Sequence, residues 1–277
     1  DMGTPERQKR VEKDILNGVC EARNLESERV AIFLDRDGTI NIEKGFLKNH
    51  DDLELIEHAG SAIKKINKSK YLSVCITNQP VIARGECSVQ GLNKIHASLK
   101  NLLGREGAYL DGLYYCPHHP DKGFKGEVVQ LKIKCDCRKP EIGLFLKAAN
   151  DMNINLKKSW MIGDRTGDIS SAKSAGMLSV ILDTGAGGLD NKHQIRPDIR
   201  LNNLDAATRF IVDDYEDWFN EIGDNISKIT QNKFIFIDGS SRDVRLIGTS
   251  ILKNQLERNE TKVHIIELDK FLIDRSN

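Results

Sequence analysis

The segment Val30–Asn41, VAIFLDRDGTIN, is an apolar run that ends in two aspartates and a glycine. Its first five residues are typical of a strand covered on both faces. Asp35 and Asp37 then fall on the same side of an extended chain, because side chains alternate with period two, and Gly38 permits a tight turn. One carboxylate as nucleophile and a second as proton donor would suit phosphoryl transfer through an acyl phosphate. A solvated turn or part of a calcium loop is the alternative interpretation of this segment taken alone.

Length and charge narrow the classes of function. The 277 residues suggest about two domains. Lys plus Arg and Asp plus Glu both number 41, and this balance argues against nucleic acid or an anionic membrane as the main partner. No apolar run approaches the roughly 20 residues that span a membrane, and no signal-peptide pattern opens the chain, so we expect a cytoplasmic protein. Six cysteines, three of them close together, favour a metal site among reduced thiols over a disulfide framework.

Apolar strand patterns alternate with helical patterns along most of the chain. The expected strands are Val30–Leu34, Tyr71–Ile76, Gly112–Tyr115, Ser159–Ile162 and Leu178–Leu182, and the expected helices cover about 5–20, 56–68, 92–103 and 142–151. This alternation predicts an α/β fold with an open, doubly wound, Rossmann-like parallel sheet. Ligands of such sheets bind in the crevice outside the carboxyl ends of the strands.

Two short pairs of metal-binding residues flank the loop 120–134. They are Cys116-Pro117-His118 and Cys135-Asp136-Cys137. Four such ligands fit a closed tetrahedral structural zinc, which would hold together a long loop that has no core. His119 could replace His118 as the ligand, and the alternative to a metal site is a set of free thiols beside a solvated histidine.

Chemically active side chains follow three strands and precede a helix: Asp35 and Asp37, Thr77, Asp164 and Asp168, and Lys139. Asp35 and Asp164, with the main-chain carbonyl of Asp37, would supply oxygen ligands for Mg²⁺. Lys139 stands before a proline that opens a helix, so it can face an anion together with the helix N-terminus. Thr77 can donate a hydrogen bond to a phosphate oxygen. These requirements are those of phosphate-ester hydrolysis.

Taken together, the motifs between Ser27 and Asp198 resemble the haloacid dehalogenase superfamily of phosphohydrolases. Within that superfamily they look like the D-glycero-D-manno-heptose 1,7-bisphosphate phosphatases, whose relatives are the histidinol-phosphate phosphatases. It is carried by DRDGTIN at 35–41, TNQ at 77–79, IARG at 82–85, YYCPHHP at 114–120, CDCRKP at 135–140, and GD at 163–164 with a second aspartate four residues on. The resemblance implies a fold with a zinc loop and no large cap domain.

The resemblance also implies roles for individual residues. Asp35 would be the nucleophile, and Asp37 would protonate the leaving alcohol and then activate water, which requires a raised pKa at Asp37. The phosphate and substrate would be bound by Thr77, Asn78, Arg84, Arg138 and Lys139. Mg²⁺ would be held by Asp35, Asp37 and Asp164, and structural Zn²⁺ by Cys116, His118, Cys135 and Cys137.

The segments outside the phosphatase motifs suggest neighbouring domains. The opening DMGTPE resembles the closing segment of sugar-1-phosphate nucleotidyltransferases. KFIFID at 233–238, followed by Gly239, resembles the start of a P-loop kinase, although Val244 and Arg245 stand where the motif needs glycine and lysine. A Rossmann-like fragment with no nucleotide role is the alternative. We expect a linker helix, possible tail of a nucleotidyltransferase domain, over 1–26, the phosphatase domain over 27–200, a helical linker over 201–229, and a degenerate kinase-like domain from 230 to 277.

The sequence therefore predicts a Mg²⁺-dependent phosphomonoester hydrolase that forms an aspartyl phosphate and forms part of a multifunctional fusion. Its expected substrate is a small sugar or polyol phosphate in a nucleotide-activated sugar pathway, such as capsule or lipopolysaccharide synthesis. One alternative is a histidinol-phosphate phosphatase. The other is a polynucleotide 3′-phosphatase fused to a kinase, which zero net charge and the CPHHP loop disfavour.

Overall fold

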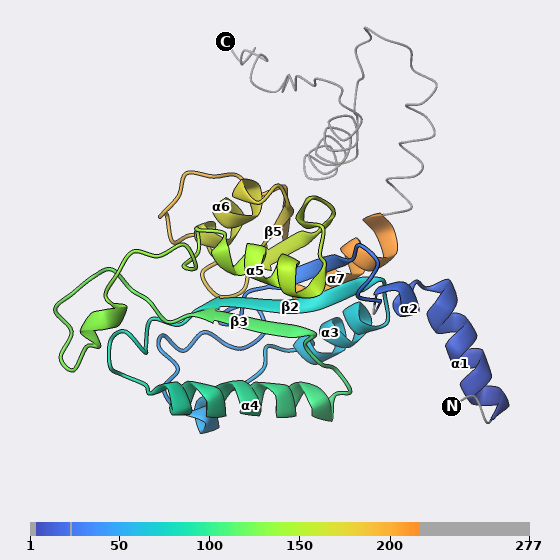
Figure 1. Cartoon of the computed structure of the whole chain (residues 1–277), viewed down its shortest axis with the longest axis horizontal. Helices are drawn as coiled ribbons and strands as arrows, with labels where there is room; N and C mark the ends of the chain where they lie inside the picture. The colour runs from blue at the N-terminus through green and yellow to red at the C-terminus, as the bar shows by residue number, and fades with distance from the viewer. Residues whose placement is uncertain (1–3, 23, 216–277) are drawn as a thin grey trace, which may run out of the picture. The chain divides into compact units, whose positions relative to one another are not determined.

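The computed structural model describes residues 4–22 and 24–215. The chain divides into two compact units, Asp1–Val212 and Asp213–Asn277. The first unit contains a six-stranded parallel sheet in the order β3-β2-β1-β4-β5-β6 (Figure 1). Its strands are β1 Val30–Leu34, β2 Tyr71–Asn78, β3 Gly112–Cys116, β4 Trp160–Gly163, β5 Leu178–Leu182 and β6 Ile199–Leu201. This is the doubly wound order, which confirms the predicted fold class, and the order reverses between β1 and β4.

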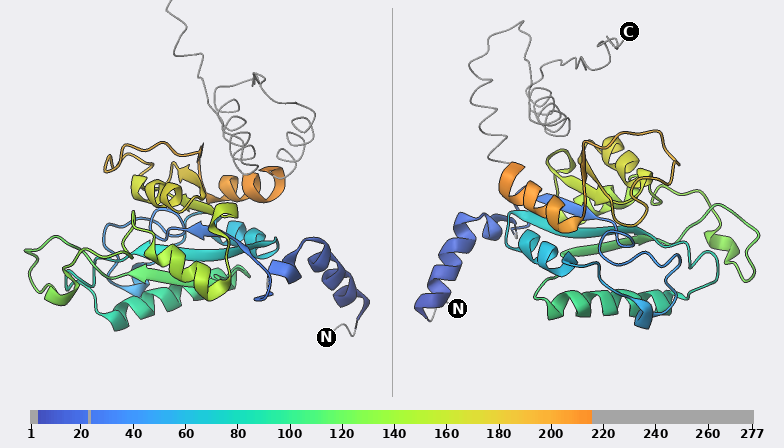
Figure 2. Two further views of the ribbon diagram at one scale, coloured as in Figure 1. Left: turned by 45° about the horizontal axis from the view of Figure 1, so that its top comes forward. Right: turned by 180° about the vertical axis from the view of Figure 1, so that it is seen from behind.

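Helices cover both faces of the sheet (Figures 1 and 2). The helices that pack on the sheet are α3 Ala59–Asn67, α4 Val89–Arg105, α5 Gly143–Met152, α6 Thr166–Ser174 and α7 Leu204–Arg209. Helix α1, Pro5–Leu16, extends away from the sheet and buries none of its residues, and the short helix α2, Val19–Ala22, follows it (Figure 1). Short 3-10 helices lie at His50–Asp52, Val129–Leu131 and Leu156–Lys158, and a π-helix at Phe210–Asp214. Alternation along β3 separates the two faces: Tyr114 donates to Asp151 of α5, whereas the ring of Tyr115 lies against His96 of α4. Helices α3 and α7 contact each other.

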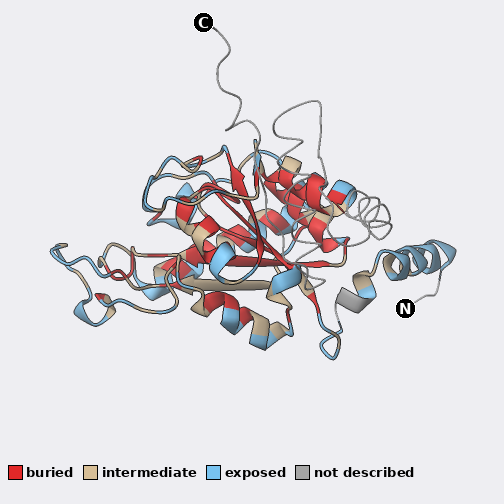
Figure 3. Cartoon of the chain, turned by 90° about the horizontal axis from the view of Figure 1, so that it is seen from above, coloured by how far each residue is buried: buried red, intermediate tan, exposed pale blue. Residues whose placement is uncertain are grey.

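The sheet forms the core of the unit. Residues 31–34 of β1 are completely buried, and Figure 3 shows the central strands buried along their length. Phe33 packs edge-on against Phe145 of α5, with ring centroids 5.2 Å apart. Burial on both faces explains why β1 has no polar alternation, and truncating such a phenylalanine to alanine typically costs about 3–5 kcal/mol.

The observed elements differ from the expectations at the edges of the domain. The N-terminal helix ends at Leu16 rather than near residue 20, and Gly18 then adopts a positive φ of 69°. The compact unit continues past residue 200 through β6 and α7, so the expected domain boundary falls inside it. β6 was missed because its three residues are too short to display a period. Most of the expected linker 201–229 and all of the kinase-like segment 230–277 lie outside the described residues.

Long loops, rather than an inserted domain, surround the carboxyl edge of the sheet. No large cap is evident in residues 4–22 and 24–215, which agrees with the expected fold. Of the helices that the structure describes, none combines the length and the apolar character needed to cross a membrane.

Candidate active site

Neighbouring strands place the first carboxylates side by side. In the register of β1 and β4, Leu34 lies opposite Ile162, and the Asp35 N–H donates to the Ile162 carbonyl at 3.0 Å. Asp35 and Asp164 are therefore the first residues after two adjacent strands, β1 and β4. A third carboxylate, Asp168, comes from the first turn of α6, and ligand atoms of the three lie within 4.8 Å of one another.

Lys139 brings a buried positive charge to these carboxylates. Its ammonium lies 2.9 Å from Asp35 Oδ1 and 2.6 Å from Asp168 Oδ1, and it donates to the Ile76 carbonyl at 2.8 Å. Burial alone would lower the pKa of Lys139, but the ion pairs with Asp168 and Asp35 outweigh burial and raise it. The lysine is therefore charged, and its three contacts fix the position of the ammonium.

The three carboxylates are only partly neutralised. Burial raises the pKa of Asp164 to about 8, with further contributions from Asp35 and Asp168. Burial also raises the pKa of Asp35 to about 6, partly offset by Lys139. Asp164 is completely buried, and its Oδ1 has no hydrogen-bond partner among the described residues, although Oδ2 accepts from Ala186 N at 2.7 Å. An orphaned carboxylate oxygen beside two more carboxylates fits a hard divalent cation such as Mg²⁺.

Two glycines let the backbone close over Asp164. A Cβ on Gly38, where φ is +81°, would lie 2.4 Å from Asp164 Oδ2, and one on Gly185, where φ is +57°, would lie 2.2 Å from the same atom. Side chains are therefore excluded at both positions by contact and by backbone conformation. Thr184 Oγ1 joins the two loops by donating to the Gly38 carbonyl at 2.7 Å.

Asp37 has surroundings that differ from the expectation. Its carboxylate is paired with Arg36 at 2.8 Å and accepts hydrogen bonds from Asn41 at 2.9 Å and Gln79 at 2.9 Å. Burial favours protonation, but these donors outweigh it and hold the pKa of Asp37 below its ordinary value rather than above it. The side-chain carboxylates that could hold a metal are those of Asp35, Asp164 and Asp168, and the expected contact through the main-chain carbonyl of Asp37 stays a prediction.

The TNQ motif at the end of β2 contacts both Asp37 and the main chain of Lys139. Gln79 Nε2 donates to Thr77 Oγ1 at 2.8 Å as well as to Asp37. The Asn78 side chain makes two hydrogen bonds of 3.0 Å with the main chain of Lys139, one to its carbonyl and one from its N–H. Asn78, expected among the binding residues, thus uses its amide to hold the lysine that reaches the carboxylates.

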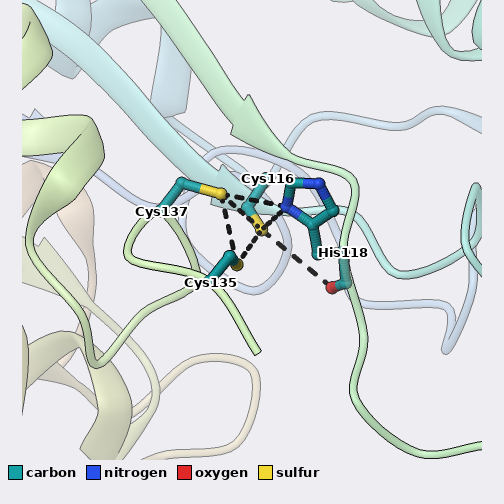
Figure 4. Close-up of side chains that lie close together, drawn as sticks. All are labelled: Cys116, His118, Cys135 and Cys137. Atoms are coloured by element: carbon teal, nitrogen blue, oxygen red, sulfur yellow. Dashed lines mark hydrogen bonds between the residues drawn. The ribbon is translucent and has the colours of Figure 1, made fainter. Parts of the chain in front are cut away.

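The four expected zinc ligands lie together at the base of the long loop (Figure 4). Cys137 Sγ is 3.2 Å from His118 Nδ1, 3.2 Å from Cys116 Sγ and 3.3 Å from Cys135 Sγ. Ligand atoms about 2.3 Å from a tetrahedral zinc would be separated by about 3.7 Å, so the four atoms need little movement to accept one. His119 is not in this group, because its Nδ1 accepts instead from Asp121 N at 3.2 Å.

Three cationic side chains, Arg84, Lys132 and Arg138, form a cluster near His119. The Arg84 guanidinium is stacked between two rings, 4.1 Å from the Phe46 centroid and 4.4 Å from that of Phe124. Lys132 also lies over Phe124, with its ammonium 4.4 Å from the ring centroid. Burial lowers the pKa of His119, and the nearby charges of Arg138, Arg84 and Lys132 lower it further. The expected binding residues Arg84 and Arg138 are therefore close together, with Lys132 as a third member.

Comparisons with known proteins agree with this geometry. A family model described as HAD-hydrolase-like matches residues 136–207. A D-glycero-β-D-manno-heptose-1,7-bisphosphate 7-phosphatase of Haemophilus ducreyi is 40% identical over 175 residues, which are 63% of this chain and 93% of that relative. The chain belongs to the haloacid dehalogenase-like phosphatases.

Other members of this family extend the comparison. A D-glycero-β-D-manno-heptose-1,7-bisphosphate 7-phosphatase of Escherichia coli is 37% identical over 152 residues, covering 55% of this chain and 78% of the relative. The structure of a D,D-heptose 1,7-bisphosphate phosphatase of B. bronchiseptica, complexed with magnesium and phosphate, superposes with a TM-score of 0.58 at 28% identity. It covers 66% of this chain and 98% of the neighbour.

Sequence reasoning gave no role to three residues of this haloacid dehalogenase-like phosphatase site. Asp168 was grouped with Asp164 as a carboxylate that follows β4, but it was assigned no metal or ion-pair role. Gln79 belongs to the TNQ motif, but its contact with Asp37 depends on how β2 lies beside β1. Lys132 had no signal, because it is one of several lysines in a loop without periodicity.

Proposed function

We propose that this phosphatase hydrolyses a small sugar or polyol phosphate through an aspartyl phosphate formed on Asp35. The buried group of Asp35, Asp164, Asp168 and Lys139 carries this proposal. Lys139 and the Arg36 N–H, at 2.9 Å and 2.7 Å, both contact Asp35 Oδ1 and so fix the direction of the carboxylate. A nucleophile held in this way is pre-oriented for in-line attack on phosphorus.

Residues of the chain fit a bound divalent cation. Asp164 and Asp35, with Asp168 beside them, would hold Mg²⁺. The ion would neutralise the phosphoryl oxygens that the carboxylates otherwise repel. Lys139 would bind one of those oxygens, and the Thr77 hydroxyl at the end of β2 would donate to another.

Asp37 would move the proton. In the first step it protonates the leaving alcohol oxygen, and in the second it takes a proton from the water that attacks the aspartyl phosphate. Arg36, Asn41 and Gln79 stabilise its ionised form, which is the form required in the second step. The first step requires the acid, and the negative charge of an arriving phosphate would raise the pKa of Asp37.

The cation cluster supports a substrate with a second anionic group. Lys132 is almost completely buried, and its ammonium forms an ion pair with Glu127 at 3.6 Å but has no hydrogen-bond partner among the described residues. Arg84 Nε is also buried without a hydrogen-bond partner among the described residues. Buried cations with unused donors favour a phosphate ligand, and relatives of this chain are named for a heptose bisphosphate. We therefore propose a sugar bisphosphate, in a pathway that makes nucleotide-activated heptose, as the substrate.

Phosphate release from a substrate panel tests the proposal. The panel contains both anomers of heptose 1,7-bisphosphate, a polyol monophosphate, histidinol phosphate and an oligonucleotide 3′-phosphate, each with Mg²⁺. We expect Asp35-dependent turnover to be greatest with a heptose bisphosphate and to disappear in Asp35→Asn. If histidinol phosphate or the oligonucleotide is turned over fastest, that compound class is the substrate and the heptose assignment is wrong. If no phosphate release depends on Asp35, the proposed reaction is wrong.

A further inference from the structure

Arg36 is held by two partners at once. Its side chain is 1% exposed. One edge of the guanidinium faces Asp37, with Nε 3.2 Å from Oδ1 and one terminal nitrogen 2.8 Å from each carboxylate oxygen. The other terminal nitrogen lies 3.3 Å from Nε2 of His96. The plane of the guanidinium is therefore defined by Asp37 on one side and by His96 on the other.

His96 is itself placed by a rigid element. It belongs to the 17-residue helix α4, where it shares the buried face with Leu92, Ile95 and Leu99. The N-terminus of this helix is capped by Ser88, whose Oγ accepts from Gly91 N at 3.0 Å. The imidazole also packs against Tyr115 of β3, with centroids 5.5 Å apart. The position of His96 in the helix and the contact with the Tyr115 ring together orient Nε2 towards Arg36.

Chemistry assigns the direction of this contact. All nitrogens of an arginine side chain are donors, so Nε2 of His96 must be the acceptor and its proton must be on Nδ1. Burial lowers the pKa of His96 to about 3, and the charge of Arg36 lowers it further, so the imidazole is neutral at physiological pH. A neutral imidazole with this tautomer completes the hydrogen bonding of a buried cation.

We propose that His96 is a positioning residue for the reaction: by accepting from Arg36, it keeps the guanidinium aligned with Asp37. This inference rests on the proposed function, in which Asp37 moves the proton. Without the acceptor, Arg36 would hold a buried N–H with no partner, a loss that favours rotation towards another oxygen. Asp37 would then lose the charged donors of Arg36, and only Asn41 and Gln79 would remain to stabilise its carboxylate as it releases the proton.

Three substitutions separate positioning from packing. Oε1 in His96→Gln can reach the place of Nε2, whereas the shorter amide of His96→Asn matches Nδ1 and falls short of Arg36. His96→Leu keeps apolar packing but has no acceptor. We expect His96→Gln to retain kcat within about threefold, and His96→Asn and His96→Leu to lose roughly tenfold or more, with KM changed less than about twofold.

Two outcomes would overturn this inference. One is equal kcat in the glutamine and asparagine variants, measured at a temperature where thermal unfolding shows both to be folded. The other is a ¹⁵N NMR spectrum of the wild-type protein that places the His96 proton on Nε2. The spectrum requires no turnover. It therefore tests the hydrogen bond between Arg36 and His96 even if the Asp35→Asn control shows that the proposed reaction does not take place.

Discussion

At the scale of single residues, Lys139 is the balancing charge of the site. Removing it with Lys139→Met would leave Asp35 and Asp168 close together and buried without a cation. We expect the metal-free variant to lose about 3–5 kcal/mol of unfolding free energy. Urea unfolding in a chelator measures this loss. The matched control is Lys147→Met, which breaks an exposed pair with Asp151 and should cost less than about 1 kcal/mol. Equal costs for the two variants would contradict the buried ion pairs.

The same carboxylates predict a pH dependence of stability. The folded protein raises the pKa of Asp35 to about 6 and of Asp164 to about 8, from an ordinary value of 3.8. In a chelator, the folded state therefore holds protons that the unfolded chain has released, and stability falls as pH rises through this window. Excess Mg²⁺ should reverse the fall, since it binds the ionised carboxylates. Urea midpoints on either side of the window, with and without Mg²⁺, measure the effect, and a metal-free midpoint that rises with pH would contradict it.

At the scale of elements, we expect the loop after β3 to depend on zinc bound by Cys116, His118, Cys135 and Cys137. We expect about one zinc per chain in the wild-type protein and a large loss in Cys137→Ser, because Cys137 contacts the other three ligands. Without zinc, trypsin should cut faster after exposed Lys122 and Lys125. Metal analysis and limited proteolysis test this, with exposed Cys20→Ser as the control. Full zinc content in Cys137→Ser would contradict the assignment.

At the scale of the whole molecule, the first compact unit should suffice for the chemistry. Every residue of the candidate site lies within Asp1–Val212. The phosphatase of Haemophilus ducreyi matches this chain over 175 residues, which are 93% of its own length. We expect a protein ending at Tyr215 to unfold cooperatively and to retain kcat within about twofold. Circular dichroism and phosphate release measure these properties, and loss of activity in the folded shorter protein would show that residues 216–277 are required.

The sequence by itself determined the parallel α/β fold, because strand and helix periods are local. It also indicated Asp35, Asp164, Lys139 and the four residues of the Cys/His cluster, because strand ends and paired Cys and His motifs are local too. Only the tertiary structure decided the direction in which the pKa of Asp37 shifts: Arg36, Asn41 and Gln79 lower it, and Gln79 directly follows another strand, β2. The contact between Arg36 and His96 joins residues 60 positions apart. Such contacts depend on how strands and helices lie beside one another, and no local pattern encodes that arrangement.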